Sequence, residues 1–221
     1  MLDDALRASV RGHVRQVETL TDLEAGHFAA VTTVERAFRG CTIGLGVAEA
    51  ADGEIVALDG VVWRVPADGV PLIAPPDLGL PFAVAASGGV ASTALLLAGT
   101  TMSDLVSAID RIGGDAAPGS VVAVRVDGTF TDVLLRSEPR QEPPYQLLSH
   151  VLEHEVRFAY SEWTGTLVGF RFPDTSDGVA IPGLHLHALA ADYASGGHCH
   201  RATVIDARLT AWIDDVEFSV S

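Results

Sequence analysis

The sequence contains no lysine: all 14 of its basic residues are arginines, against 29 aspartates and glutamates. Pyridoxal-phosphate enzymes and Schiff-base decarboxylases or aldolases need a lysine amine, and a Walker-type phosphate loop needs one too. These classes are excluded, so any carbanion chemistry must use another electron sink, for which a metal ion is the first candidate. The formal net charge of −15 predicts that neither nucleic acid nor a membrane surface is a partner.

Cysteine is scarce, and no long apolar run is present. Cys41 and Cys199 are too few for a disulfide scaffold or a cysteine-rich zinc module. The longest uncharged stretch, residues 78–103, contains a proline and several glycines, which makes it a poor membrane helix. The first residues are acidic and unlike a secretory signal. With 48% hydrophobic and 19% charged residues, the composition predicts a globular, cytoplasmic protein.

The spacing of apolar residues predicts a mixed α/β fold in two parts, dominated by mixed and antiparallel β-sheets. Helical spacing marks the start of the chain, and Asp-Gly pairs then separate short β patterns. The elements expected in the first half are a helix over residues 2–18, a helix starting at the capping box Thr21–Glu24, a β-meander over residues 31–65 with turns at Asp52-Gly53 and Asp59-Gly60, and a helix that Ser103 caps and Gly113-Gly114 ends.

A stretch with proline and glycine, residues 115–120, is the expected boundary between the halves. Residues 1–115 then form an N-terminal α/β half with the meander. Residues 116–221 form a C-terminal β-rich half, and the two together make one unit. The elements expected in the second half are a hairpin turning at Asp127-Gly128, a short helix over residues 146–158, a strand over residues 183–190, and a turn at Gly196-Gly197 before the next strand.

Half of the eight histidines lie close together near the end of the chain. On a strand, His185 and His187 share a face and lie roughly 6.5–7 Å apart, so both imidazoles can reach one ion. His198 follows a Gly-Gly pair, and a strand returning from it can supply a third ligand. Three histidines with an open position are typical of catalytic zinc. His200 is a less favoured candidate, and Cys199 is expected to be a packed thiol.

A second pattern, His150-Val-Leu-Glu-His154, matches the H-x-x-E-H motif of inverted zinc peptidases. On a helix, the two histidines share a face. Those peptidases also need a downstream acidic ligand and a larger chain, so a solvated helix face is the favoured interpretation.

Further motifs precede and surround the histidine cluster in a defined order. They are Gly44-Leu-Gly46, Asp52-Gly-Glu54, Leu58-Asp-Gly60, Pro81-Phe-Ala-Val84, Asp127-Gly-Thr-Phe130, Arg136-Ser-x-Pro139 with Arg140-Gln141, Pro144-Tyr145, Gly165-Thr-Leu-Val-Gly-Phe170, Pro182-Gly-Leu-His-Leu-His187 and Ser195-Gly-Gly-His198. From about Leu20 to His198, this series resembles the α-acetolactate decarboxylase family.

The resemblance implies a carboxy-lyase of acetoin biosynthesis that converts (S)-2-acetolactate to (R)-acetoin and CO2 through a metal-bound enediolate. It implies that His185, His187 and His198 hold Zn²⁺, that Glu54 and Arg136 are catalytic, that no organic cofactor takes part, and that the protein is a homodimer. Loss of CO2 from a β-keto acid leaves electron density on the ketone oxygen, which a Lewis acid stabilises. Three imidazoles also suit other divalent ions.

In this scheme Arg136 either positions the substrate carboxylate, which its guanidinium fork suits, or helps to deliver the proton. Glu54 moves a proton between water, the substrate hydroxyl and the enediolate. The chain departs from the family pattern at Val47, where a threonine is common, and a C-terminal extension with a further active-site glutamate is expected to be missing. Two alternatives stay open. One is a catalytically divergent metal-binding homologue that binds a small hydroxy-keto acid. The other is a cupin-like metalloenzyme, although no glutamate follows His187 at the cupin spacing.

Overall fold

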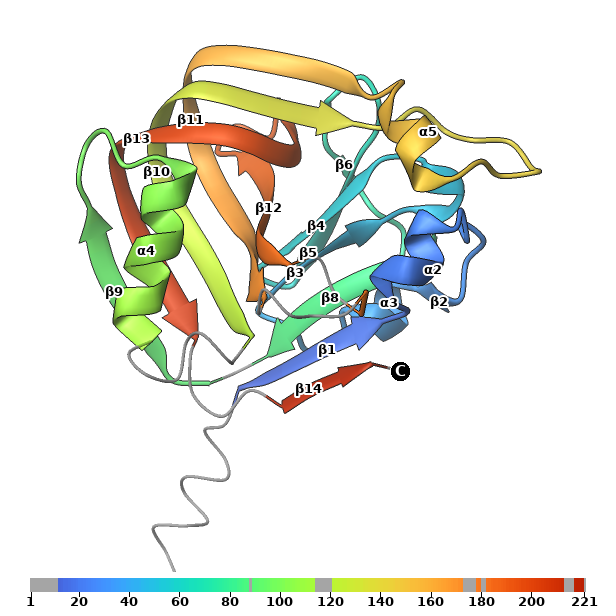
Figure 1. Cartoon of the computed structure of the whole chain (residues 1–221), viewed down its shortest axis with the longest axis horizontal. Helices are drawn as coiled ribbons and strands as arrows, with labels where there is room; N and C mark the ends of the chain where they lie inside the picture. The colour runs from blue at the N-terminus through green and yellow to red at the C-terminus, as the bar shows by residue number, and fades with distance from the viewer. Residues whose placement is uncertain are drawn as a thin grey trace, which may run out of the picture.

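The computed structural model describes residues 12–87, 89–113, 121–172, 178–179, 182–212 and 217–220. Two β-sheets dominate it, with short helices at their edges (Figure 1), so the predicted mixed α/β class is confirmed. The seven-stranded sheet runs, in spatial order, through β14 (Glu217–Val220), β1 (His13–Val17), β8 (Phe82–Ser87), β3 (Ile43–Val47), β4 (Glu54–Leu58), β5 (Val61–Val65) and β6 (Leu72–Ile73).

The second sheet has five strands, three of which are long. Its order is β10 (Val122–Ser137), β11 (Val156–Phe172), β12 (Gly183–Ala190), β13 (Gly196–Trp212) and β9 (Ala91–Leu96). Strand β10 also pairs with β13, so strands β10 to β13 are hydrogen-bonded in a ring. The remaining elements are α2 (Leu20–Glu24), α3 (Val34–Ala37), the 3-10 turn η1 (Glu49–Ala51), α4 (Met102–Gly113), α5 (Leu148–Leu152), and the pair β2 (Thr32–Thr33) and β7 (Gly79–Leu80).

The hydrophobic core fills the space between the two sheets and the space under α4. Strand β11 contributes Val168 and Phe170 to a cluster that includes Ile43 and Leu45 of β3. These four side chains are almost fully buried, and their burial joins one sheet to the other. Helix α4 lies against β9, β10 and β13 (Figure 1), where Ile109 packs into a second cluster.

Several expectations from the sequence are confirmed. Strands β3, β4 and β5 form the antiparallel meander within residues 31–65, with Asp59-Gly60 between β4 and β5. Helix α4 ends at Gly113, and residues 183–190 form β12 as expected. No helix within the described residues is both long enough and apolar enough to cross a membrane.

The prediction of an opening helix over residues 2–18 is wrong for residues 12–18, which the structure describes. His13–Val17 is strand β1, which pairs with β8 and with β14; residues 2–11 lie outside the described residues. Apolar spacing in such a short window fits either element, and pairing on both sides decides for the strand. The expected helix over residues 146–158 shrinks to Leu148–Leu152, because β11 begins at Val156.

The expected hairpin at Asp127-Gly128 is also wrong, because β10 runs straight through this pair. Gly128 lies opposite Gly165 on one side and Ala207 on the other. A Cβ atom on Gly128 would lie 2.3 Å from the carbonyl oxygen of Asp206, so this glycine permits close strand approach rather than a turn.

The turn expected at Gly196-Gly197 is made instead by residues 191–195, and both glycines begin β13. Gly197 has a φ of +130°, and a Cβ atom there would lie 2.4 Å from the carbonyl oxygen of Arg136. A glycine is therefore required where β13 approaches β10 next to the histidines.

The two helix caps lie two residues earlier than expected. Thr19, not Thr21, accepts the backbone N–H of Asp22 at the start of α2. At α4, the Thr101 hydroxyl accepts from the backbone N–H of Asp104 at 3.4 Å, and the Asp104 carboxylate accepts from the Thr101 N–H at 3.0 Å. This reciprocal arrangement is a capping box with an aspartate.

The expected boundary between the halves, residues 115–120, lies outside the described residues, so the division stays a prediction. The sheets exchange strands across it. Strand β9 precedes the boundary but joins the five-stranded sheet, and β14 follows it but joins the seven-stranded sheet.

Candidate active site

Strand register brings the predicted metal ligands together. His185 and His187 alternate along β12, opposite Phe170 and Val168 of β11. Across the other edge of β12, His187 is the Cα partner of His198 on β13. Because alternate residues of a strand share a face, the two ladders place all three imidazoles on one side of the sheet.

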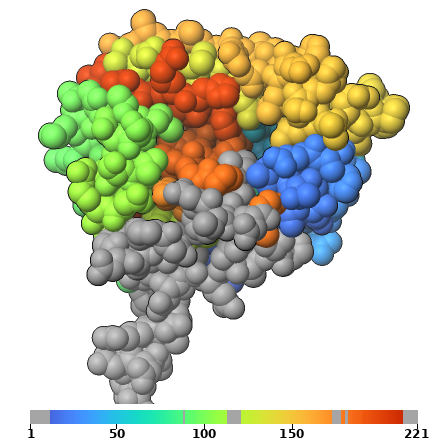
Figure 2. All heavy atoms as spheres, viewed as in Figure 1, coloured from blue at the N-terminus to red at the C-terminus, as the bar shows by residue number. Residues whose placement is uncertain are grey.

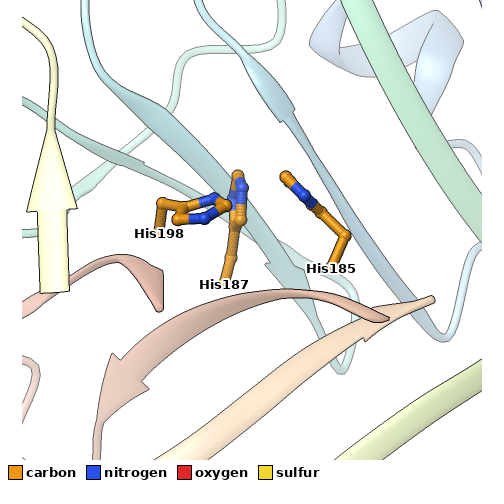
Figure 3. Close-up of side chains that lie close together, drawn as sticks. All are labelled: His185, His187 and His198. Atoms are coloured by element: carbon orange, nitrogen blue, oxygen red, sulfur yellow. The ribbon is translucent and has the colours of Figure 1, made fainter. Parts of the chain in front are cut away.

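The three rings converge from β12 and β13 (Figure 3). One nitrogen from each of His185, His187 and His198 lies within 4.8 Å of the other two. The ring centroids are 4.5 Å apart for His185 and His198 and 5.2 Å apart for His185 and His187. This spacing suits a single ion with about 2.0–2.1 Å to each nitrogen after small side-chain rotations.

The residues fit a divalent metal in their protonation as well as in their position. Burial lowers the pKa of His187, against the opposing effect of the Glu54 carboxylate, and lowers the pKa values of His185 and His198 further. The positive charge of Arg136 acts in the same direction as burial, so the neutral form of the three imidazoles is favoured. Neutral imidazole is the form that binds metal. His187 Nδ1 lies 2.8 Å from the backbone oxygen of Ile55, which leaves Nε2 directed at the site.

One ring nitrogen of the triad lacks a hydrogen-bond partner within the part of the chain that the structure describes. Nδ1 of His198 is buried and has no hydrogen-bond partner among the described residues. A buried polar atom without a partner is costly, and metal ligation would satisfy it.

The other sheet supplies Glu54, the first residue of β4, which is buried beside the histidines. Its Oε2 lies 3.3 Å from His187 Nε2. Its Oε1 accepts a hydrogen bond from Arg136 Nη1 at 2.8 Å. Arg136 is itself the Cα partner of His198, so both predicted catalytic residues lie next to the predicted metal ligands.

Two carboxylates that sequence reasoning missed complete the surroundings of Arg136. Glu138 forms an ion pair with Arg136 Nη1, and Glu155 Oε2 lies 3.1 Å from Arg136 Nε. All three carboxylates, including Glu54, are buried. Glu155 also pairs with Arg157, so three carboxylates and two guanidinium groups meet beside the histidine triad.

Glu155 connects this cluster to the surface. Burial opposes its ionisation, but the hydrogen bond from Arg157 and the charges of Arg136 and His200 lower the pKa of the carboxyl overall. His200 Nε2 lies 3.2 Å from Glu155 Oε1. His200 is thus held by Glu155 and lies outside the triad, and Cys199 is a buried free thiol as expected.

A small pocket with about 40 Å³ of free space adjoins the cluster. Its polar lining comes from Glu54, Arg136, Glu138, His185 and His187. Its apolar lining comes from Leu23, Leu45, Val47, Phe82 and Leu148, with Gly46 between them. Val47, where the family resemblance predicts a threonine, lies opposite Glu54 in the β3–β4 ladder and therefore at the site itself.

Comparison with known proteins identifies the family of this chain. The family model described as Alpha-acetolactate decarboxylase matches residues 14–218. The alpha-acetolactate decarboxylase of Methanosarcina mazei is 33% identical over 183 residues, which make up 83% of this chain and 63% of that protein. The one of Methylococcus capsulatus is 33% identical over 204 residues, or 90% of this chain and 77% of that protein.

Solved structures share the fold. Alpha-acetolactate decarboxylase from Bacillus subtilis strain 168 superposes with a TM-score of 0.85 at 25% identity, covering 94% of this chain and 88% of that chain. This chain spans less than two thirds of the length of the Methanosarcina relative. These relatives are decarboxylases by name, and the family model covers nearly the whole sequence. The chain belongs to the alpha-acetolactate decarboxylase family.

Proposed function

We propose that this chain catalyses the metal-dependent decarboxylation of (S)-2-acetolactate to (R)-acetoin and CO2. The observation that carries the proposal is the contact between the histidine triad and the buried Glu54–Arg136 pair, with Glu54 Oε2 3.3 Å from His187 Nε2. The family assignment supports this reaction and argues against the cupin-like alternative.

His185, His187 and His198 would hold the metal, which we propose to be Zn²⁺. When bound, Zn²⁺ supplies the Lewis acid that stabilises the electron density left on the substrate as CO2 departs. The chain has no lysine to serve as an alternative electron sink.

Arg136 would position the substrate carboxylate. Its ion pairs among the described residues use Nη1 and Nε, which leaves Nη2 available to donate to an incoming anion. The surrounding carboxylates hold the guanidinium in one orientation, so the side chain is fixed before the substrate arrives.

Glu54 would hold or move a proton at its carboxylate. It is buried, it touches both Arg136 and His187, and it lines the pocket. A carboxylate within hydrogen-bond reach of the reacting atoms can accept a proton from a substrate hydroxyl and return one to the carbon that loses CO2.

The apolar side of the pocket would exclude water and contact the methyl groups of the substrate. Leu45, Val47, Phe82 and Leu148 line it. A dry pocket also strengthens the electrostatic interactions of Arg136 and Glu54 with the substrate.

The test is to incubate purified, zinc-loaded protein with racemic acetolactate and follow acetoin by chiral chromatography. We expect (R)-acetoin to form well above the spontaneous rate, a chelator to abolish the activity, and zinc to restore it. His185→Gln should lose both metal and activity. If the metal is bound but no acetoin forms above background, the chain is instead a divergent homologue that binds a hydroxy-keto acid.

The family resemblance also supports a homodimer, and the composition supports a cytoplasmic location. Light scattering on the purified protein would measure the mass of the assembly. A measured mass of 23.1 kDa, which is the mass of one chain, would contradict the dimer.

A further inference from the structure

Helix α5 and the turn after it carry a second group of metal-ligating side chains, far more exposed than the triad. His150, Glu153 and His154 each place one ligand atom within 4.8 Å of the other two, and all three residues are exposed. Figure 1 shows α5 at the periphery of the fold, and Figure 2 shows the yellow to gold segment around it projecting at the upper right edge.

The backbone holds these residues on one face. Helix α5 ends at Leu152, but the chain continues to coil, because the N–H of His154 donates to the oxygen of Val151 at 3.0 Å. Residues at i, i+3 and i+4 of a helical turn are neighbours. Accordingly, the rings of His150 and His154 have centroids 4.9 Å apart, and His150 Nδ1 lies 3.4 Å from Glu153 Oε2.

A separate contact prepares His154 as a ligand. Its Nδ1 lies 3.0 Å from the backbone oxygen of His150. A carbonyl oxygen only accepts, so Nδ1 carries the proton in this contact, and Nε2 of a neutral ring keeps its lone pair. Metal-binding histidines typically donate their second ring nitrogen to a carbonyl or carboxylate in this way.

We propose that His150, Glu153 and His154 form a second, solvent-accessible site for a divalent transition metal. Two imidazoles and one carboxylate suit Zn²⁺, Ni²⁺ or Cu²⁺, whereas Mg²⁺ and Ca²⁺ prefer oxygen ligands. The net charge of −15 favours the approach of any cation. The proposal does not depend on the decarboxylase activity.

Occupation of this site would stabilise the helix that forms part of the active-site wall. Helix α5 has only five residues, and helices this short are marginal on their own. Its Leu148 lines the pocket, and its Val151 is buried in the core between the sheets. A metal that joins His150 to His154 spans one helical turn and would hold that turn closed.

The test is a calorimetric titration of metal-free protein, without a histidine tag, with NiCl2. We expect two classes of site in the wild type. The double variant His150→Gln/His154→Gln should lose the weaker class, with its affinity reduced at least tenfold, while His185→Gln should lose only the tighter class. His27→Gln, which changes another exposed histidine paired with an aspartate, should keep both.

Hydrogen exchange gives a second measurement. Amides of residues 148–155 should exchange more slowly when nickel fills the weaker site, and the double variant should not show this protection. A wild type that binds one equivalent, or a double variant that keeps the weaker class unchanged, would overturn the site. Binding without added protection would overturn the stabilisation of α5.

Discussion

Arg136 and His198 are direct partners across the ladder of β10 and β13. His198 is in turn the partner of His187 on β12, so one line of strand pairing carries the arginine and two of the three proposed metal ligands. A slip of one residue in either ladder would turn a side chain to the opposite face and dismantle the site. The relative positions of arginine and metal are therefore set by backbone hydrogen bonds.

Replacing Arg136 with lysine should lower turnover about 100-fold, because lysine keeps the charge but loses the planar fork that orients a carboxylate. Metal content, measured by elemental analysis, should stay unchanged. Lysine is a better test than alanine, since removing the charge would leave the buried carboxylates of Glu54 and Glu138 without their arginine partner and destabilise the fold. Arg140→Lys, at an exposed arginine, is the matched control. Equal turnover in the two variants would contradict a role for Arg136.

Replacing Glu155 with glutamine should lower kcat about tenfold. This loss is much smaller than the one expected when a well-oriented catalytic group is itself removed. Glu155 orients Arg136 through a 3.1 Å contact with Nε but does not line the pocket. A positioning role predicts a loss in kcat with metal content unchanged. Glu142→Gln is the control, because Glu142 is exposed and pairs loosely with Arg140 at 3.8 Å. Should both variants keep wild-type kcat, Glu155 is structural only.

Much of the site could be predicted because its signals are local. A His-x-His pair on a strand points both rings to one face whatever the rest of the fold does, and β12 follows that pattern. The roles of Glu54 and Arg136 came from resemblance, since nothing in their neighbouring residues predicts burial. Glu138 is the unnamed residue of the Arg136-Ser-x-Pro139 motif. Its position two residues after the arginine could have predicted an ion pair between them.

Glu155 could not be found in this way, because its place depends on contacts between distant parts of the chain. It precedes β11, and only the pairing of β11 with β10 brings it to Arg136. The error at Gly128 has the same origin. An Asp-Gly pair is a strong local turn signal, but the neighbouring strand β13 approaches this glycine too closely for a side chain.

The cap of α4 gives a test of local structure. Thr101→Ala removes the hydroxyl that accepts from Asp104 N–H and should cost about 1 kcal/mol in the free energy of unfolding. Ser103→Ala, at the residue that the sequence alone indicated, should cost much less, because within the described part of the chain its hydroxyl contacts the Thr101 side chain alone. Chemical denaturation of both variants measures the difference. If Ser103→Ala lowered the free energy of unfolding more than Thr101→Ala, α4 would be capped by Ser103 rather than by Thr101.

The two cysteines give a prediction for pH. Burial raises the pKa of Cys199 to about 12 and that of Cys41 to about 11, the latter despite the nearby charge of Arg15. Only the thiolate reacts with an alkylating reagent, so at pH 8 about one Cys41 in a thousand is reactive, and about one Cys199 in ten thousand. Raising the pH increases the thiolate fraction, and labelling should accelerate about tenfold per pH unit up to pH 10.

Iodoacetamide labelling of the single variants Cys41→Ser and Cys199→Ser, followed by mass spectrometry, separates the two rates. The thiol left in Cys199→Ser should react faster, since Cys41 is both less buried and more acidic. Unfolding in denaturant should abolish the difference, because both thiols then return to a pKa of about 8.5. A rate that levels off near pH 9 in the folded protein would mean that the thiol concerned is solvated, and that the chain around it is not packed as described.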